Sequence, residues 1–267
     1  MSLVKRFGMG SLLLVLIACH NVSLAAEQNT GGPSPEELAK ANNPLADANA
    51  LNFQNYYGSS LYGLTDQTND SFLLRPVIVS GQQIIRMTLP VNTVPSNSTS
   101  VSGLGDFNVF DAFVLSPKGA TMQYGVGPML VVPTATRDET GQGKWQIGAA
   151  GVLVSPLPGG SMFAGLVTWQ TDFAGPSDRA HTNFLTAQPI GIFQVGGGFY
   201  LRSSGLWTRD FENNRTLIPF GLGAGKIFRM GKTLVNAFAE PQFTIYHKGN
   251  GQPAWQLFSG INLQWLK

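Results

Sequence analysis

The sequence predicts an all-β fold: a transmembrane antiparallel up-and-down β-barrel of about 12 strands, preceded by a short N-terminal helical segment. Three observations carry this prediction. Apolar and polar residues alternate along segments of roughly 9 to 11 residues or slightly more, the length with which a tilted strand crosses a bilayer. Long polar connections alternate with short turns along the chain. Only 12% of the residues are charged, about half the usual share for a soluble protein.

The N-terminus has the order of features found in a secretory signal. Lys5 and Arg6 precede an apolar run from 12 to 18, and small residues follow at 23, 25 and 26. Residues 1–26 are therefore expected to form a cleaved signal peptide. A second interpretation stays open, because "LIAC" at 16 to 19 resembles a lipobox, in which 1–18 are removed and Cys19 is lipidated. Cys19 is the only cysteine, so the chain can form no internal disulfide.

Residues 27–47 form a polar segment with one helix signal, "SPEELAKANN". Ser34 can cap the helix, Pro35 suits its first turn, and Glu37 completes a capping box. We expect a helix of about two turns. This segment is a candidate plug for the barrel that follows at 48–267.

In the barrel region, apolar and polar residues alternate along segments that are separated by turn signals, a pattern that predicts β-strands. Twelve such segments can be counted. Their approximate bounds are 48 to 57, 71 to 79, 82 to 91, 104 to 115, 120 to 133, 145 to 154, 161 to 173, 182 to 194, 198 to 207, 216 to 229, 233 to 247 and 254 to 266. Six of them contain a proline, where we expect bulges or local kinks.

The connections and the tryptophans agree with a membrane barrel. Long connections such as "NTVPSNSTSVSG" and "TATRDETGQGK" alternate with short ones such as "SG" and "MGK", as in barrels with periplasmic turns and external loops. Four tryptophans fall at strand ends beside long loops and a fifth near the opposite rim, where aromatic girdles lie. These are Trp145, Trp169, Trp207, Trp255 and Trp265.

The last strands assign the two faces of the wall. In "LVNAFAEPQFTIY" one face is apolar, and the other carries Asn236, Glu240 and Gln242. The apolar face is expected to meet lipid, because lipid-facing and lumen-facing residues alternate along a barrel strand. Asn236, Glu240 and Gln242 are thus candidate polar residues of the lumen.

The stretch "IPFGLGAGKIFRMGK", 218 to 232, has glycines and a lysine like those of a phosphate-binding loop, but the spacing does not match one. In strand parity, Gly221, Gly223 and Gly225 share the lumen side. We expect these glycines to make space inside the barrel, either for a plug, for a facing side chain or for a solute.

Two arginines are expected to point into the lumen. If Ser80 and Gly81 form a turn, Arg75 lies opposite Arg86. Like charges at opposed positions need compensation, for which Asp106 and Glu240 are the candidate carboxylates. An internal salt-bridge network is the favoured interpretation, and a selectivity site for solutes is the alternative.

Four stretches, "SGLGDFNVFDAFVLSP", "GVGPMLVVPTATRDETGQGKWQIGAAG", "LTAQPIGIF" and "IPFGLGAGKIFRMGK", resemble a family of bacterial outer-membrane β-barrel proteins. Its members are often described as transporters, or misleadingly given the name neuromedin U, and they are related to the MetA-pathway phenol-degradation proteins. The resemblance runs over nearly all of the mature chain. It implies an outer-membrane barrel that admits small or hydrophobic molecules, and it implies no catalytic residue. A lipobox would depart from the family pattern.

Several function classes are disfavoured by the composition. Without the signal, the chain carries 15 Lys and Arg against 15 Asp and Glu, so it offers no electrostatic footprint for nucleic acid. Neither His181 nor His247 is followed at two residues by a serine, as it is in the outer-membrane phospholipase. No Cys, His or carboxylate cluster has metal-ligand spacing. We expect no enzyme activity, no metal and no cofactor.

The sequence therefore predicts a passive channel or transporter of the bacterial cell outer membrane for small solutes, hydrophobic ones among them. Its partners would be the lipid bilayer, outer-membrane lipids and a solute that the sequence does not name. The runner-up is a structural or adhesive surface barrel with a closed lumen. A lipid hydrolase is a weaker alternative.

Overall fold

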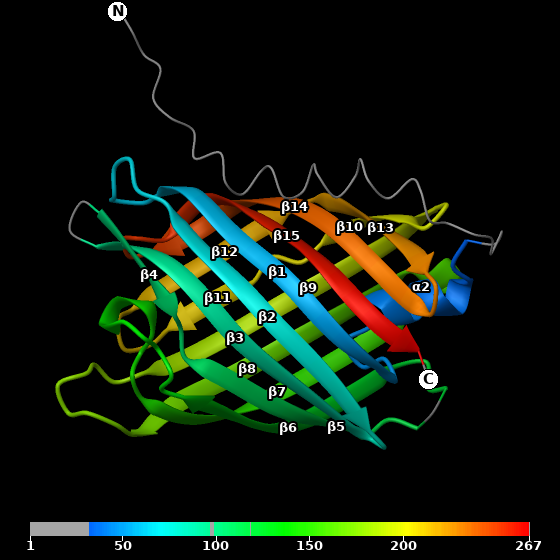
Figure 1. The fold of residues 1–267 in the computed structure, drawn as a ribbon, viewed down its shortest axis with the longest axis horizontal. Coiled ribbons are helices and arrows are strands. Elements are labelled where there is room, and N and C mark those ends of the chain that lie inside the picture. Colours follow the sequence, from blue (N-terminus) through cyan, green and yellow to red (C-terminus); the bar gives the residue numbers. More distant parts are fainter. Residues whose placement is uncertain (1–31, 97–98, 118, 267) are drawn as a thin grey trace, which may run out of the picture. The chain divides into compact units, whose positions relative to one another are not determined.

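The computed structural model describes residues 32–266 except 97–98 and 118. The predicted signal peptide and Cys19 lie outside the described residues. In the described part of the chain the fold is a closed antiparallel barrel of 12 strands with one short helix, as the sequence predicts. β15 pairs with both β14 and β1, which closes the sheet (Figure 1).

Nine barrel strands are continuous, and three consist of two shorter strands each, namely β4 with β5, β10 with β11 and β12 with β13, within the residues described. The bounds are β1 Ala48–Leu61, β2 Asn69–Ser80, β3 Gln83–Ser96, β4 Thr99–Leu104, β5 Phe107–Val114, β6 Gln123–Val132, β7 Trp145–Pro156, β8 Met162–Ala174, β9 Asn183–Gly196, β10 Phe199–Ser203, β11 Trp207–Asp210, β12 Arg215–Gly221, β13 Gly223–Met230, β14 Thr233–Lys248 and β15 Pro253–Leu266. The helices are α2 Pro35–Asn42, and the short 3-10 turns η2 Asp138–Thr140 and η3 Pro158–Gly160.

Turns at one end of the barrel are short, and we call this end the turn rim. Gly81 (φ 63°) follows β2, and Gly231 (φ 58°) follows β13, in backbone conformations that L side chains rarely adopt. The longer connections lie at the opposite end, the loop rim. Figure 1 shows α2 and the C-terminus at the turn rim.

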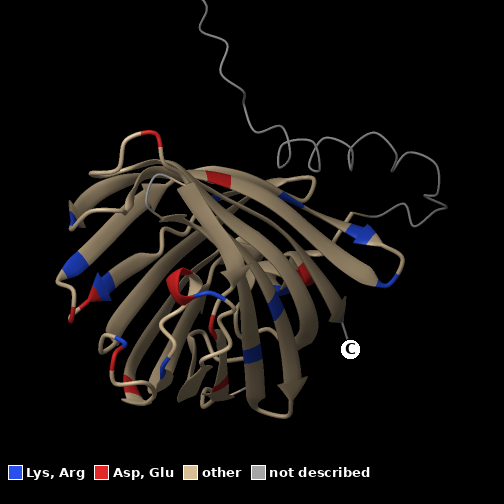
Figure 2. Cartoon of the chain, turned by 60° about the vertical axis from the view of Figure 1, so that its left-hand side comes forward, with Lys and Arg blue, Asp and Glu red and all other residues tan. Residues whose placement is uncertain are grey.

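The outer surface of the barrel is apolar. Exposed large side chains include Phe72, Ile147, Val167, Phe220 and Ile245, and charged positions are sparse along the strands (Figure 2). Four of the five tryptophans, Trp145, Trp169, Trp207 and Trp265, are also among the exposed large side chains. An apolar surface of this extent is costly in water, whereas it matches the interior of a lipid bilayer.

The prolines disturb some strands only. The ladder between β2 and β3 skips Pro76, the ladder between β5 and β6 skips Pro128, and a register shift precedes Pro219. Pro189 and Pro241 stay in register with their partners on β8 and β15. Proline has no backbone N–H, so we expect a kink only where that N–H would have donated a hydrogen bond to the neighbouring strand.

Helix α2 is built as its sequence predicts. The Glu37 backbone N–H donates to Ser34 Oγ at 3.3 Å, and the Ser34 N–H donates to Glu37 Oε2 at 2.9 Å, which completes the capping box. Leu38, Ala41 and the following Leu45 are buried in one apolar cluster with barrel side chains. Members such as Val79, Ile84, Val154 and Ile227 lie close to the short turns, so this cluster fills the lumen near the turn rim. No helix in the described part of the chain has the length and apolar character needed to cross a membrane.

Candidate functional site

A fully buried ion pair lies inside the barrel. Arg202 Nε of β10 donates to Glu240 Oε2 of β14 at 2.8 Å, and the two side chains are 8% and 0% exposed. The Ser204 hydroxyl and backbone N–H both donate to the same carboxylate, at 2.7 Å each. Gln242 Nε2 donates to Glu240 Oε1 at 2.9 Å, and Gln256 Nε2 donates to Gln242. With this many partners, the desolvation cost of both charges is offset.

The glycines of β12 and β13 make room for this network. A Cβ at Gly221 would overlap the Glu240 carboxylate, and a Cβ at Gly223 would meet the backbone of β14. A Cβ at Gly225 would overlap the ring of Tyr200. From the sequence, a plug, a facing side chain or a solute could fill the space beside these glycines. In the structure, facing side chains and the backbone of β14 lie there. The glycines allow close packing of the wall and leave no open path there.

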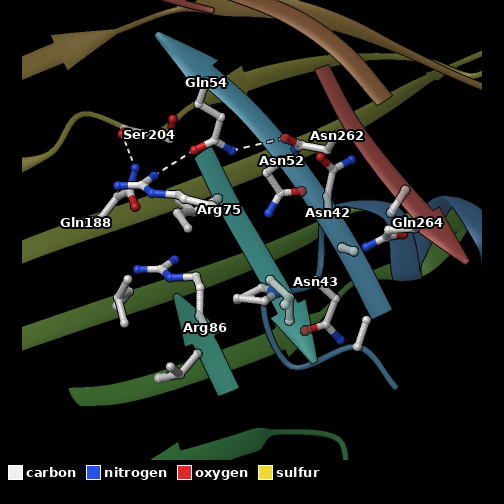
Figure 3. Close-up of a pocket in the computed structure, with 18 of the residues that line it drawn as sticks. Asn42, Asn43, Asn52, Gln54, Arg75, Arg86, Gln188, Ser204, Asn262 and Gln264 are labelled. Atoms are coloured by element: carbon white, nitrogen blue, oxygen red, sulfur yellow. Dashed lines mark hydrogen bonds between the residues drawn. The ribbon is translucent and has the colours of Figure 1, made fainter. Parts of the chain in front are cut away.

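A cavity of about 150 Å³ lies beside this network in the lumen. Its polar lining combines three arginines with amide side chains (Figure 3), and its apolar lining comes from several strands, β2, β3, β5, β7, β8, β9 and β15 among them. The polar side chains are Asn42, Asn43, Asn52, Gln54, Arg75, Arg86, Gln188, Arg202, Ser204, Asn262 and Gln264. Among the described residues that line it, none is an aspartate or a glutamate.

Arg75 and Arg86 both point into this cavity, as their parity predicts (Figure 3). Arg75 Nη1 donates to Gln54 Oε1 at 2.6 Å. The Arg86 guanidinium lies 4.5 Å from the centre of the Phe110 ring. The Nε atoms of both arginines are buried and have no hydrogen-bond partner among the described residues.

The predicted pairing of these arginines is shifted by two residues. Arg86 lies opposite Val77 rather than Arg75, because the turn is formed by Gly81 and Gln82 and not by Ser80 and Gly81. A two-residue shift preserves the face of each side chain, so both arginines still reach the lumen. They are diagonal neighbours on β2 and β3.

The two carboxylates expected to neutralise Arg75 and Arg86 have other partners. Glu240 is paired with Arg202. Asp106 lies at the loop rim, where it accepts hydrogen bonds from the backbone N–H groups of Ala135, Gln142 and Gly143 at 2.6 to 3.2 Å. The sequence placed Asp106 in a strand from 104 to 115, with a register shift expected between Asp106 and Asp111, and offered it as a lumen carboxylate. The strand breaks at 105–106 instead, and its register with β3 changes there by one residue.

The N-terminal segment is attached to the barrel wall at several points. Asn236 Nδ2 donates to the Ala41 carbonyl at 3.2 Å and to Asn42 Oδ1 at 2.9 Å, while Asn236 Oδ1 accepts from Tyr200. Gln264 donates to the Lys40 carbonyl at 3.2 Å. Asn236 is thus a lumen residue, as expected, and its partner is the segment that lies against the cavity.

An ion pair between Glu37 of α2 and Arg229 of β13 adds to this attachment. The pKa of Glu37 is lowered from its ordinary value, chiefly by the hydrogen bond from the Ser34 backbone N–H. Burial opposes this effect, and the charge of Arg229 reinforces it. Ionised Glu37 is therefore the form that the folded helix favours.

A groove of about 340 Å³ lies on the outer side of the wall. It is lined almost wholly by apolar and aromatic residues, including Phe163, Phe193, Trp207 and Phe220. Ser203 and Gly205 border the groove where the chain leaves β10. The outer groove and the lumen cavity share Ile190 as a lining residue.

The two histidines of the described chain, His181 and His247, each have an identified partner. His181 Nδ1 is hydrogen-bonded to Asp172 at 3.0 Å, and His247 stacks on Tyr62, both at the loop rim. Neither imidazole contacts a serine hydroxyl through a hydrogen bond among the residues described. In that same part of the chain, no three His, Cys, Asp or Glu side chains are grouped as around a metal ion.

Sequence reasoning missed three members of the interior network, Tyr200, Arg202 and Ser204. The signal was present, because Tyr200 and Arg202 alternate with the exposed Phe199 and Leu201 along β10. An arginine at a lumen position within an otherwise apolar strand is as informative as Arg75. Ser204 lies in the gap after β10, where strand periodicity has no predictive value.

No family model matches this sequence, so its resemblance to the neuromedin U and MetA-pathway proteins stays a prediction. No curated protein matches it either. The fold is similar to the crystal structure of the COG4313 outer membrane channel from Pseudomonas putida F1, with a TM-score of 0.61 and 14% sequence identity. The match covers 82% of this chain and 94% of that chain. At this identity the likeness concerns the fold: this chain has the architecture of that channel.

Proposed function

We propose that this protein is a passive channel of the bacterial outer membrane for small solutes, hydrophobic ones among them. The observation that carries the proposal is the lumen cavity of about 150 Å³, which is lined jointly by the barrel wall and by residues 41–46 of the N-terminal segment. A barrel with a closed, purely structural interior would have no need for a polar cavity in contact with a separable segment. The fold likeness to an outer-membrane channel and the signal-like N-terminus support the location.

The N-terminal segment would act as the gate in this channel. It is attached by hydrogen bonds to Asn236, Gln264 and Gln123, by an ion pair with Arg229, and by the burial of Leu38, Ala41 and Leu45 against barrel side chains. Each such hydrogen bond contributes on the order of 1 kcal/mol and each buried leucine roughly 1.5 to 3 kcal/mol, so the released segment is a minor state that a bound ligand would have to favour. The apolar outer groove, which shares Ile190 with the lumen cavity, favours apolar molecules as part of the solute range.

Single-channel recording in planar bilayers tests this proposal. The full chain should show brief or small conductance steps, and a variant that lacks residues 27–47 should conduct more and for longer. Heat-modifiable migration on a gel would establish that both proteins are folded. If neither folded protein conducts, the channel proposal fails, and the structural or adhesive surface barrel becomes the better assignment. We assign no catalytic residue and no cofactor.

A further inference from the structure

We propose that the lumen cavity is a binding site for a small organic carboxylate. Its anionic group would lie between Arg75 and Arg86, and its apolar body would lie against Phe110, Val152 and Leu166. This inference rests on the proposed channel function and names the substrate class that the channel would select.

The charges of the cavity are not balanced within the described chain. Arg202 has Glu240 as its partner, whereas neither Arg75 nor Arg86 takes part in an ion pair among the described residues. The cavity lining holds three arginines and no acidic residue in that part of the chain. An unpaired charge away from bulk water is costly, and an anion from solution would offset that cost.

The two guanidinium groups are placed to share one anion. Arg86 lies opposite Val77, so Arg75 is its diagonal neighbour on the adjacent strand. Diagonal neighbours in an antiparallel pair are roughly 7 to 8 Å apart, which leaves room for one carboxylate between two long side chains. Figure 3 shows both side chains extending from β2 and β3 into the same cavity. The Nε–H of each is a free donor among the described contacts.

The remaining lining indicates an organic anion. Phe110 packs on the Arg86 guanidinium, and Val77, Ile84, Val152, Leu166 and Ile190 also line the cavity. The volume of about 150 Å³ is several times the roughly 30 Å³ that one water occupies in the liquid. Inorganic phosphate would gain nothing from the apolar wall, whereas a carboxylate with a compact apolar body would bury it there.

Isothermal titration calorimetry on the detergent-solubilised full chain tests the proposal. We expect benzoate to bind at least tenfold more tightly than benzamide, which has the same shape and no charge, and more tightly than phosphate. Benzoate affinity should fall as chloride is added. The double variant Arg75→Gln, Arg86→Gln should weaken benzoate binding at least tenfold. The matched variant Arg209→Gln removes a β11 arginine whose partners are Thr216 and Asn214, outside the cavity, and should bind as the parent does.

Equal binding of benzoate and benzamide by the parent protein would overturn the proposal, as would unchanged benzoate binding in the folded double variant. If phosphate bound more tightly than benzoate, the assignment of an organic anion would be overturned. If the double variant does not fold, the comparison of benzoate with benzamide on the parent decides. Because binding needs no open pore, benzoate binding by a protein that never conducts would reject the channel and keep the site. Conductance without benzoate binding would reject the carboxylate site and keep the channel.

Discussion

Arg202 of β10 and Glu240 of β14 form a buried ion pair across β13, which lies between the two strands, with 2.8 Å between Nε and Oε2 and a separation of 38 positions in the sequence. The guanidinium also lies 3.6 Å from the ring centre of Phe238. This pair holds the wall together where β10 ends and where β12 and β13 are interrupted. Its stability contribution is open to a double-mutant test.

Glu240→Gln should destabilise the barrel by roughly 3 to 5 kcal/mol, because it leaves Arg202 buried without a counter-charge. Arg202→Met should cost a similar amount. The double variant should lose clearly less than the sum of the two single losses, since no unpaired charge is left. Urea titration of folding in lipid vesicles, followed by tryptophan fluorescence, measures these values. Strict additivity would mean that the pair contributes no coupling energy.

If the N-terminal segment acts as the proposed gate, Glu37 predicts a pH dependence of the conductance. Its pKa in the folded state is lowered, so the attachment of α2 is at full strength above the ordinary value of 4.5 and weakens as pH falls below it. Conductance should therefore rise in acid, below about pH 4.5, and Glu37→Gln should show the raised conductance already at neutral pH.

The control for this test is Glu36→Gln on the same helix turn. Glu36 is exposed and pairs only with Lys40 among the described ion pairs, so its replacement should leave the conductance unchanged. Equal effects of the two variants would reject a specific role for the Glu37–Arg229 pair.

Gly225 is required by Tyr200. A methyl group at Gly225 would overlap the Tyr200 ring, whose hydroxyl donates to Asn236 at 2.6 Å. Gly225→Ala should cost about 1 to 3 kcal/mol through overpacking, and Tyr200→Ala in the same chain should recover part of that loss. Gly165→Ala is the matched control, because a Cβ there meets nothing within 4 Å. The same urea titration reads out all three variants, and a cost for Gly165→Ala equal to that of Gly225→Ala would contradict the argument.

Asp106 anchors the long loop between β6 and β7. Asp106→Ala removes the acceptor of three backbone N–H groups, so the loop should open and trypsin should cleave after the exposed Arg137 several-fold faster. Asp178→Asn, a change at an exposed position of another loop, should leave this cleavage rate unaltered. An unchanged rate in Asp106→Ala would show that other contacts, such as those of Arg179 with the carbonyls of this loop, suffice.

Much of the fold could be predicted because its signals are local. A period of two along β14 assigns Asn236, Glu240 and Gln242 to the lumen and Phe243 to the outside, and all four lie as that period requires. The capping box at Ser34 depends on residues three apart. Arg75 and Arg86 were predicted on the inner face correctly although the predicted register was wrong by two residues, because a shift of two residues leaves each side chain on the same face.

By itself, the sequence determined the strand count, the two faces of the wall and the helix start, because alternation, turn residues and capping act over a few residues. Only the tertiary structure decided which polar groups meet. The partnership of Glu240 with Arg202, the loop contacts of Asp106 and the charge imbalance at Arg75 and Arg86 depend on the breaks near Gly105 and Ser204 and on closure of β15 against β1. Those contacts join residues far apart in the chain, and a register change of one residue, as between β4 and β5, alters them without altering the local pattern.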